Sequence, residues 1–127
     1  MQQPRTLRGQ AVTKTVRFSR DQITAYAQAS GDRNPIHLDE TFARSVGLPG
    51  VIAHGMLQMG LLAGLAVAEA GGDPRRLKRL SVRFAGMVEP GEEVTFGAER
   101  RPDGKLDLSA RKADGTPVLT KGLAELA

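Results

Sequence analysis

The stretch AHGMLQMGLLAGLAVAEA, residues 53–70, decides the fold of this chain. It predicts one helix over its whole length, and that helix is apolar almost all round. Such a helix is expected to be surrounded by other structure on most of its sides. Gly60, Gly64 and Ala68 recur every four residues within it, and we interpret this row of small residues as a surface for close packing on a sheet. The run Gly71-Gly72-Asp73-Pro74 then ends the helix.

After this helix, the chain predicts strands joined by turns. Apolar and polar residues alternate in successive segments, which is typical of an antiparallel sheet with one face in water. A first strand is expected before the helix. The five strands are centred on Val12–Phe18, Leu80–Phe84, Val94–Ala98, Leu106–Ala110 and Val118–Leu126. The predicted fold class is therefore α+β, with an antiparallel sheet curled around the long helix and residues 1–127 in a single domain.

Two shorter helices are predicted between the first strand and the long helix. Ser19 and Gln22 form a capping box at the start of one of them, which should end near Ser30-Gly31. Asp39 is placed to cap the other, and Phe42 and Val46 are expected to be its apolar residues.

Composition limits the function. The chain has 127 residues, 40% of them apolar, and no Cys, which excludes disulfides and thiol chemistry. Its net charge of +4 raises nucleic acid as a partner, but one Tyr, four Phe and no Trp provide no stacking platform for bases. His54, Gln58 and Glu69 interrupt the apolar run, so we expect no membrane span. The N-terminal residues do not resemble a signal peptide, and a cytoplasmic location is expected.

A second stretch, Gly31-Asp32-Arg33-Asn34-Pro35-Ile36-His37, puts an acid and an imidazole five residues apart. Pro35 restricts its own φ, lacks an N–H and pushes Asn34 towards an extended conformation, so this segment cannot be regular helix. A kinked segment can turn the side chains of Asp32 and His37 into one cavity. The alternative is a surface loop in which the Asp only caps the chain and the His has no role.

The stretch Ser30–His37, together with Ile52-Ala53-His54-Gly55-Met56, resembles the MaoC-like, (R)-specific enoyl-thioester hydratases and dehydratases. Val82-Arg83-Phe84 matches a common core-strand motif of that family, and the resemblance runs from about Phe18 to the C-terminus. The chain is most similar to the short bacterial members, which include the catalytic subunit of the mycobacterial fatty-acid dehydratase. The resemblance implies a single hot-dog fold, which agrees with the predicted elements.

The resemblance also implies a reaction, the reversible hydration of trans-2-enoyl thioesters to (R)-3-hydroxyacyl thioesters. The substrate would be carried by coenzyme A or by an acyl carrier protein, in fatty-acid, polyketide or polyhydroxyalkanoate metabolism. Asp32 and His37 would bind one water between them, and either residue can move either proton. Asn34 is expected to shape the loop. The main-chain N–H of Gly55 would stabilise negative charge on the thioester oxygen, because free N–H groups meet at a helix start.

His54 is expected to begin the long helix, to form a local hydrogen bond through its ring and to support the active loop. Neither a metal nor a cofactor is expected, since the His and Asp residues show no short helical ligand spacing. Some relatives carry a serine about two turns into the long helix, where this chain has Ala63, so a polar contact to the substrate is lost there.

A basic cluster, Arg75, Arg76, Lys78 and Arg79, follows the end of the long helix and should be exposed. One interpretation is a solvated cap, because cations are favourable near a helix C-terminus. The other is a binding site for the phosphates of coenzyme A or pantetheine, or for an acidic acyl carrier protein.

Two other functions remain open at this point. A hot-dog thioesterase would share the fold and the thioester, but it needs water to attack the carbonyl carbon. A non-catalytic partner subunit or nucleic-acid-binding module would have no use for both motifs. By the resemblance we expect at least a dimer, homomeric or with a homologous hot-dog subunit, because a single sheet leaves an edge uncovered.

Overall fold

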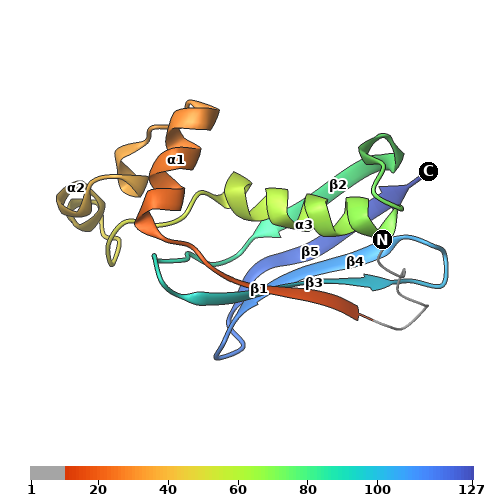
Figure 1. Cartoon of the computed structure of the whole chain (residues 1–127). Coiled ribbons are helices and arrows are strands. Elements are labelled where there is room, and N and C mark those ends of the chain that lie inside the picture. Colours follow the sequence, from red (N-terminus) through yellow and green to blue (C-terminus); the bar gives the residue numbers. More distant parts are fainter. Residues whose placement is uncertain (1–10) are drawn as a thin grey trace.

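Within residues 11–127, which the structure describes, five antiparallel strands form one sheet and a long helix lies across one of its faces (Figure 1). In this computed structural model the strands are ordered β1-β3-β4-β5-β2. The elements are β1 (Ala11–Arg17), α1 (Arg20–Ser30), η1 (Pro35–His37), α2 (Glu40–Ser45), α3 (Gly55–Glu69), η2 (Pro74–Arg76), β2 (Leu77–Phe84), β3 (Glu93–Arg100), β4 (Leu106–Lys112) and β5 (Pro117–Leu126). The α+β prediction is confirmed.

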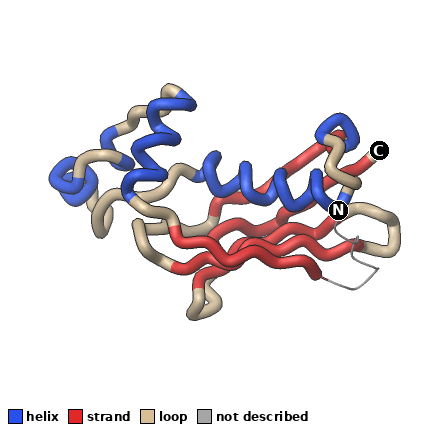
Figure 2. The backbone as a smooth tube through the Cα atoms, in the orientation of Figure 1, coloured by secondary structure: helices blue, strands red, loops and turns tan. Residues whose placement is uncertain are grey.

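The helices all lie on the same side of the sheet, and α1 and α2 gather at the end where α3 begins (Figure 2). No helix in the described part of the chain is both long and apolar enough to span a membrane.

The start and end of α1 agree with the sequence signals. Ser19 Oγ accepts a hydrogen bond from the main-chain N–H of Gln22 at 3.1 Å, and Ser19 N–H donates to Gln22 Oε1 at 2.8 Å. At the other end Gly31 has φ +80°, a left-handed conformation that favours glycine. The capping box and the helix end are therefore confirmed.

The predicted start of α2 is correct, and Phe42 lies in the helix with Val46 directly after it. Asp39 Oδ1 accepts a hydrogen bond from Phe42 N–H at 3.1 Å, so the cap is confirmed. However, Ala43 is the buried residue of this helix, Phe42 is exposed, and Val46 is exposed beyond its last turn. A helix of six residues is too short for its spacing to show which side faces the protein.

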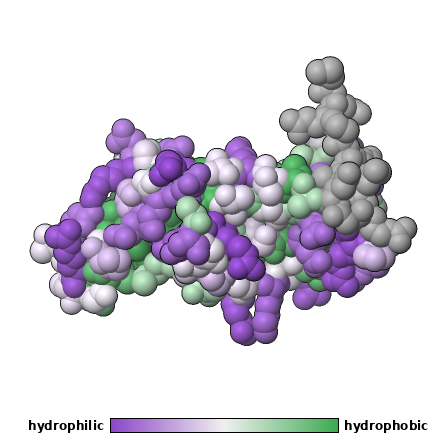
Figure 3. All heavy atoms as spheres, turned by 90° about the horizontal axis from the view of Figure 1, so that it is seen from below, coloured by the Kyte–Doolittle hydropathy of each residue, from purple (hydrophilic) through white to green (hydrophobic). Residues whose placement is uncertain are grey.

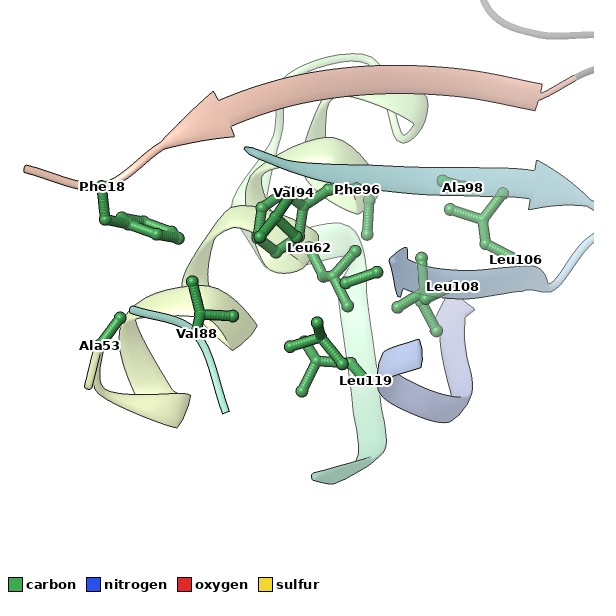
Figure 4. Packing of buried hydrophobic residues seen from close by; sticks show 14 of the residues in the cluster. Phe18, Ala53, Leu62, Val88, Val94, Phe96, Ala98, Leu106, Leu108 and Leu119 are labelled. Atoms are coloured by element: carbon green, nitrogen blue, oxygen red, sulfur yellow. The ribbon is translucent and has the colours of Figure 1, made fainter. Parts of the chain in front are cut away.

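The alternation of apolar and polar residues along the strands correctly predicts which side chains are in the core. Val94, Phe96 and Ala98 of β3 are buried, and the residues between them point to the other face of the sheet. In Figure 4, Leu62 projects from α3 towards the side chains of β3 and β4. Figure 3 looks onto the outer face of the sheet, where hydrophilic side chains are prominent. The sheet thus has the one wet face that the alternation predicts.

The orientation of α3 differs from the prediction. Its buried residues are Gln58, Leu62, Ala66 and Glu69, which face the sheet. The row expected to pack on the sheet is instead exposed, and a Cβ at Gly60 or Gly64 would meet no atom within 4 Å. We call Met56, Gly60, Gly64 and Ala68 the open row of α3. Because this helix is apolar on every side, its sequence did not distinguish the sheet-facing side from the open side.

Candidate active site

A chain of short hydrogen bonds shapes the loop between α1 and η1. Ser30 Oγ accepts from Asp32 N–H at 3.1 Å, and Asp32 Oδ1 accepts from Asn34 N–H at 3.3 Å. Asn34 Oδ1 in turn accepts from Ile36 N–H at 3.2 Å and so caps η1. Asn34 has φ −55° and ψ 127°, as expected before a proline. These bonds give the loop one conformation, in which Asp32 and His37 face each other.

His37 is fixed by the chain that precedes α3. Its Nδ1 lies 2.7 Å from the carbonyl oxygen of Ile52. A carbonyl can only accept a hydrogen bond, so Nδ1 carries the proton and Nε2 keeps its lone pair. Nε2 lies 4.0 Å from Asp32 Oδ2. This distance is longer than a hydrogen bond, and one water molecule can bind both atoms at once.

Burial and charge make His37 a neutral base. Its side chain is 8% exposed, whereas that of Asp32 is 53% exposed. Burial lowers the pKa of the His37 imidazole below its usual value of 6.5, and the neighbouring His54 lowers it further. The hydrogen bond to Ile52 and the charge of Asp32 oppose this shift but do not cancel it. His37 is therefore uncharged at neutral pH and can accept a proton through Nε2.

His54 lies behind the pair and connects three elements. It is buried, and its ring stacks on His37 with centroids 3.7 Å apart and an interplanar angle of 22°. The ring of Tyr26, in α1, contacts the ring of His54 in an edge-to-face arrangement, with their centroids 4.8 Å apart. His54 Nε2 donates to the main-chain carbonyl of Asp32 at 3.0 Å. The ring thus positions both the imidazole of His37 and the backbone of Asp32.

Gly55 begins α3 beside this ring, and the helix start has no side-chain cap. His54, the preceding residue, makes no capping bond, whereas the other described helices are capped by Ser19, Asn34, Asp39 and Asp73. No hydrogen-bond acceptor is found for the Gly55 N–H within the described residues. Together with the positive end of the helix dipole, this donor can bind negative charge.

The same cluster contains potential metal ligands. Asp32, His37 and His54 each offer one ligand atom, and these atoms lie within 4.8 Å of one another. However, the Nδ1 of His37 and the Nε2 of His54 are already bonded to carbonyls. Since the two rings are stacked, their lone pairs lie in nearly parallel planes and do not converge on one point. The absence of a metal stays a prediction.

The basic cluster lies at the opposite end of α3 from Gly55 (Figure 1). Arg76 donates to the carbonyls of Ala70, at 2.8 Å, and Ala127, at 2.8 and 3.1 Å, and so joins the end of α3 to the end of β5. Arg75 pairs with Asp73 at 3.0 Å. Lys78 and Arg79 are exposed on β2.

Sequence reasoning missed three contributors to the site. Neither Tyr26 nor the carbonyl of Ile52 carries a local signal, because each acts through a contact between distant segments. Gln58 did carry a signal, as a polar residue in an apolar run four positions after His54. It is buried, and its Nε2 donates to the carbonyls of Ala53 and His54 at 3.5 and 3.4 Å.

Known proteins resemble the chain in sequence. It is 52% identical over 108 residues to the fatty acid synthase beta subunit aflB of Emericella nidulans, and the match covers 80% of this chain and 5% of that protein. It is 35% identical over 108 residues to the probable enoyl-CoA hydratase 2 of Dictyostelium discoideum, with 84% and 37% covered. The chain thus spans only a minor part of these relatives.

The fold is also shared with solved structures. The (R)-hydratase from A. caviae involved in PHA biosynthesis superposes with a TM-score of 0.83 at 31% identity, and the match covers 96% of this chain and 98% of that one. The predicted hot-dog fold is confirmed. A family model described as the MaoC-like domain matches residues 2–120. With this match over nearly its whole length, the chain belongs to the MaoC-like domain family.

Proposed function

We propose that the chain catalyses the reversible hydration of trans-2-enoyl thioesters to (R)-3-hydroxyacyl thioesters. The observation that carries the proposal is the geometry of His37. Its Nε2 is an uncharged base 4.0 Å from the Asp32 carboxylate. Two similar proteins, a probable enoyl-CoA hydratase and an (R)-hydratase, support the same chemistry.

The proposed mechanism begins with a substrate water bound between Asp32 Oδ2 and His37 Nε2. His37 takes one proton from the water while the water oxygen bonds to C3 of the enoyl thioester. Electrons of the C2–C3 double bond move towards the thioester oxygen, where the N–H of Gly55 stabilises the charge. Protonated His37 then delivers its proton to C2, so that H and OH have been added and the base is restored. Asp32 orients the water and stabilises the imidazolium.

The first prediction concerns this pair. Asp32→Asn and His37→Ala should each lower kcat for hydration of crotonyl-CoA by about 10²- to 10⁴-fold. His37→Ala removes the base, and Asp32→Asn removes the charge that orients the water and stabilises the imidazolium. Hydration is followed by the loss of enoyl-thioester absorbance, with coenzyme A and acyl carrier protein as alternative carriers. Asp107→Asn is the matched control, because Asp107 lies exposed on the outer face of the sheet.

Near-normal turnover in both site variants, with the fold confirmed by circular dichroism, would rule out this mechanism. Release of free thiol by the wild-type protein without hydration would instead identify a thioesterase. Absence of both activities would favour a non-catalytic partner subunit.

We also propose that the chain works as a dimer, either with a second copy or with a homologous hot-dog subunit. The open row of α3 supports this proposal, as do the edges of β1 and β2, which are unpaired within residues 11–127. We further propose that the chain is cytoplasmic and that it has no nucleic-acid partner. Cell fractionation and a mobility-shift assay test these two points.

A further inference from the structure

Phe84 occupies an unexpected position at the end of β2. It points to the same side of the strand as Leu80 and Val82, which pack against the core. Its own side chain, however, is 53% exposed. The motif Val82-Arg83-Phe84 thus lies on β2, but its last side chain lies outside the core, because β2 reaches the start of α3.

The ring of Phe84 fills the space beside Gly55. A Cβ at Gly55 would lie 2.7 Å from Phe84 Cε1, 2.9 Å from Cδ1 and 3.3 Å from Cζ. Carbon atoms in contact are normally about 3.5–4.0 Å apart, so no larger residue fits at position 55 without moving the ring. The glycine is therefore needed for the packing of Phe84, in addition to any approach of a substrate.

Two more exposed apolar side chains lie on the segments next to this position. Met56 follows Gly55 in the first turn of α3 and is 58% exposed, and Met87 is 47% exposed. The segment that carries Met87 is held against the start of α3 by a hydrogen bond from Ala53 N–H to the carbonyl of Val88 at 2.8 Å. The segments next to Gly55 and Phe84 thus carry large apolar side chains that are exposed to water.

We propose that Phe84 is a specificity-determining residue, which forms the apolar wall that holds the acyl part of the substrate next to Gly55. This inference rests on the proposed function, because it takes the Gly55 N–H as the donor to the thioester oxygen. The acyl group continues directly from the thioester carbonyl, so it must lie beside the same helix turn. Flexible Met side chains next to a rigid ring suit chains of different length.

The experiment compares Phe84→Ala with Phe84→Leu on crotonyl- and 2-octenoyl-CoA. Phe84→Ala should lower kcat/KM for the eight-carbon substrate by about tenfold or more, mainly through KM, and Phe84→Leu should lower it less. Calorimetry with saturated octanoyl-CoA should show the same loss of affinity, whereas free coenzyme A should bind unchanged. Val46→Ala is the matched control, since it removes an equally exposed apolar group at the end of α2.

Gly55→Ala provides a second measurement. If the Phe84 ring fills the space of the missing Cβ, this change should weaken octanoyl-CoA binding less in the Phe84→Ala background than in the wild type. Equal effects in both backgrounds, or equal losses for both chain lengths, would overturn the proposal. A change in oligomeric state with unchanged octanoyl-CoA binding would also overturn it and assign Phe84 to a subunit interface.

A wild-type protein that binds octanoyl-CoA but hydrates no enoyl thioester would refute the proposed function. The affinity series would still decide the role of Phe84 in acyl binding, so the two failures are distinguishable.

Discussion

At His37, the hydrogen bond from Nδ1 to the Ile52 carbonyl determines what the other ring nitrogen can do. The motif that contains Asp32 and His37, together with the later motif at Ile52–Met56, identified the pair as candidates by family resemblance. The tautomer was not predictable, because Ile52 lies fifteen positions further along the chain and contributes only its backbone. The backbone around His37 thus determines which of its two ring nitrogens can accept a proton.

The second prediction is the pH dependence of the reaction. His37 must be neutral to accept a proton, so kcat/KM should fall as the pH decreases through its pKa, which burial places below 6.5. His54→Gln removes the imidazole whose proximity lowers the pKa of His37. The pKa of His37 should therefore rise and the acid limb should move to higher pH, while an N–H donor to the Asp32 carbonyl is retained.

Profiles of kcat/KM between about pH 5 and 8 check this prediction, since the imidazole titrates in that range. Tyr26→Phe is the control, because it keeps the aromatic ring that contacts His54 and removes only the hydroxyl group. An acid limb that stays in place, or moves to lower pH, in His54→Gln would show that His54 does not influence the base.

Among the elements, the helix ends were the most predictable feature. Ser19 and Asp39 cap α1 and α2 as their sequence contexts indicate, since capping is a local interaction. The start of α3 is the exception, because His54 turns its ring towards His37 and Asp32 and leaves the helix uncapped. The missing cap coincides with the position where the mechanism needs a free donor.

The third prediction separates the two interpretations of the basic cluster. Arg76→Ala should lower the free energy of unfolding by about 1–3 kcal/mol, because its charged hydrogen bonds hold the ends of α3 and β5 together. Replacing Arg75, Lys78 and Arg79 together by Gln should change stability by less than about 1 kcal/mol, since exposed charges contribute little.

If the basic cluster binds the carrier, the triple Gln variant should raise KM for carrier-bound substrates and flatten the salt dependence of KM, with kcat at saturation unchanged. Denaturant unfolding and initial rates at two salt concentrations measure these effects. The cluster lies about 20 Å from Gly55, as a helix of 15 residues requires. A carrier must therefore bridge that distance or use the site of a second chain. An unchanged KM for both carriers would leave only the helix cap.

For the molecule as a whole, a single chain leaves apolar surface uncovered. β1 pairs only with β3 and β2 only with β5, so both edges of the sheet are open among the described residues. The open row of α3 faces away from the sheet as well. Close approach of a second helix is possible along this row because Gly60 and Gly64 carry no side chains.

The fourth prediction is therefore the oligomeric state. Light scattering at micromolar concentration should give at least twice the 13.6 kDa of one chain, if a second copy is the partner. Gly64→Lys should reduce this mass, since it introduces a charge into the proposed interface. Ser109→Lys is the control, because Ser109 is exposed on the outer face of the sheet. A fully active monomer, or equal masses for both variants, would contradict the proposed interface.

Local chemistry explains what the sequence by itself determined. The strands, most helix ends and the α+β class follow from periodicity, capping and turn residues, which act over a few positions. The pair of Asp32 and His37 was assigned through the family resemblance of its motif. The tertiary structure alone decided which side of α3 meets the sheet, how Ile52 orients His37, and where Phe84 lies against Gly55. These features depend on contacts between segments far apart in the chain. An apolar helix can pack on any of its sides, and only the position of the sheet selects one.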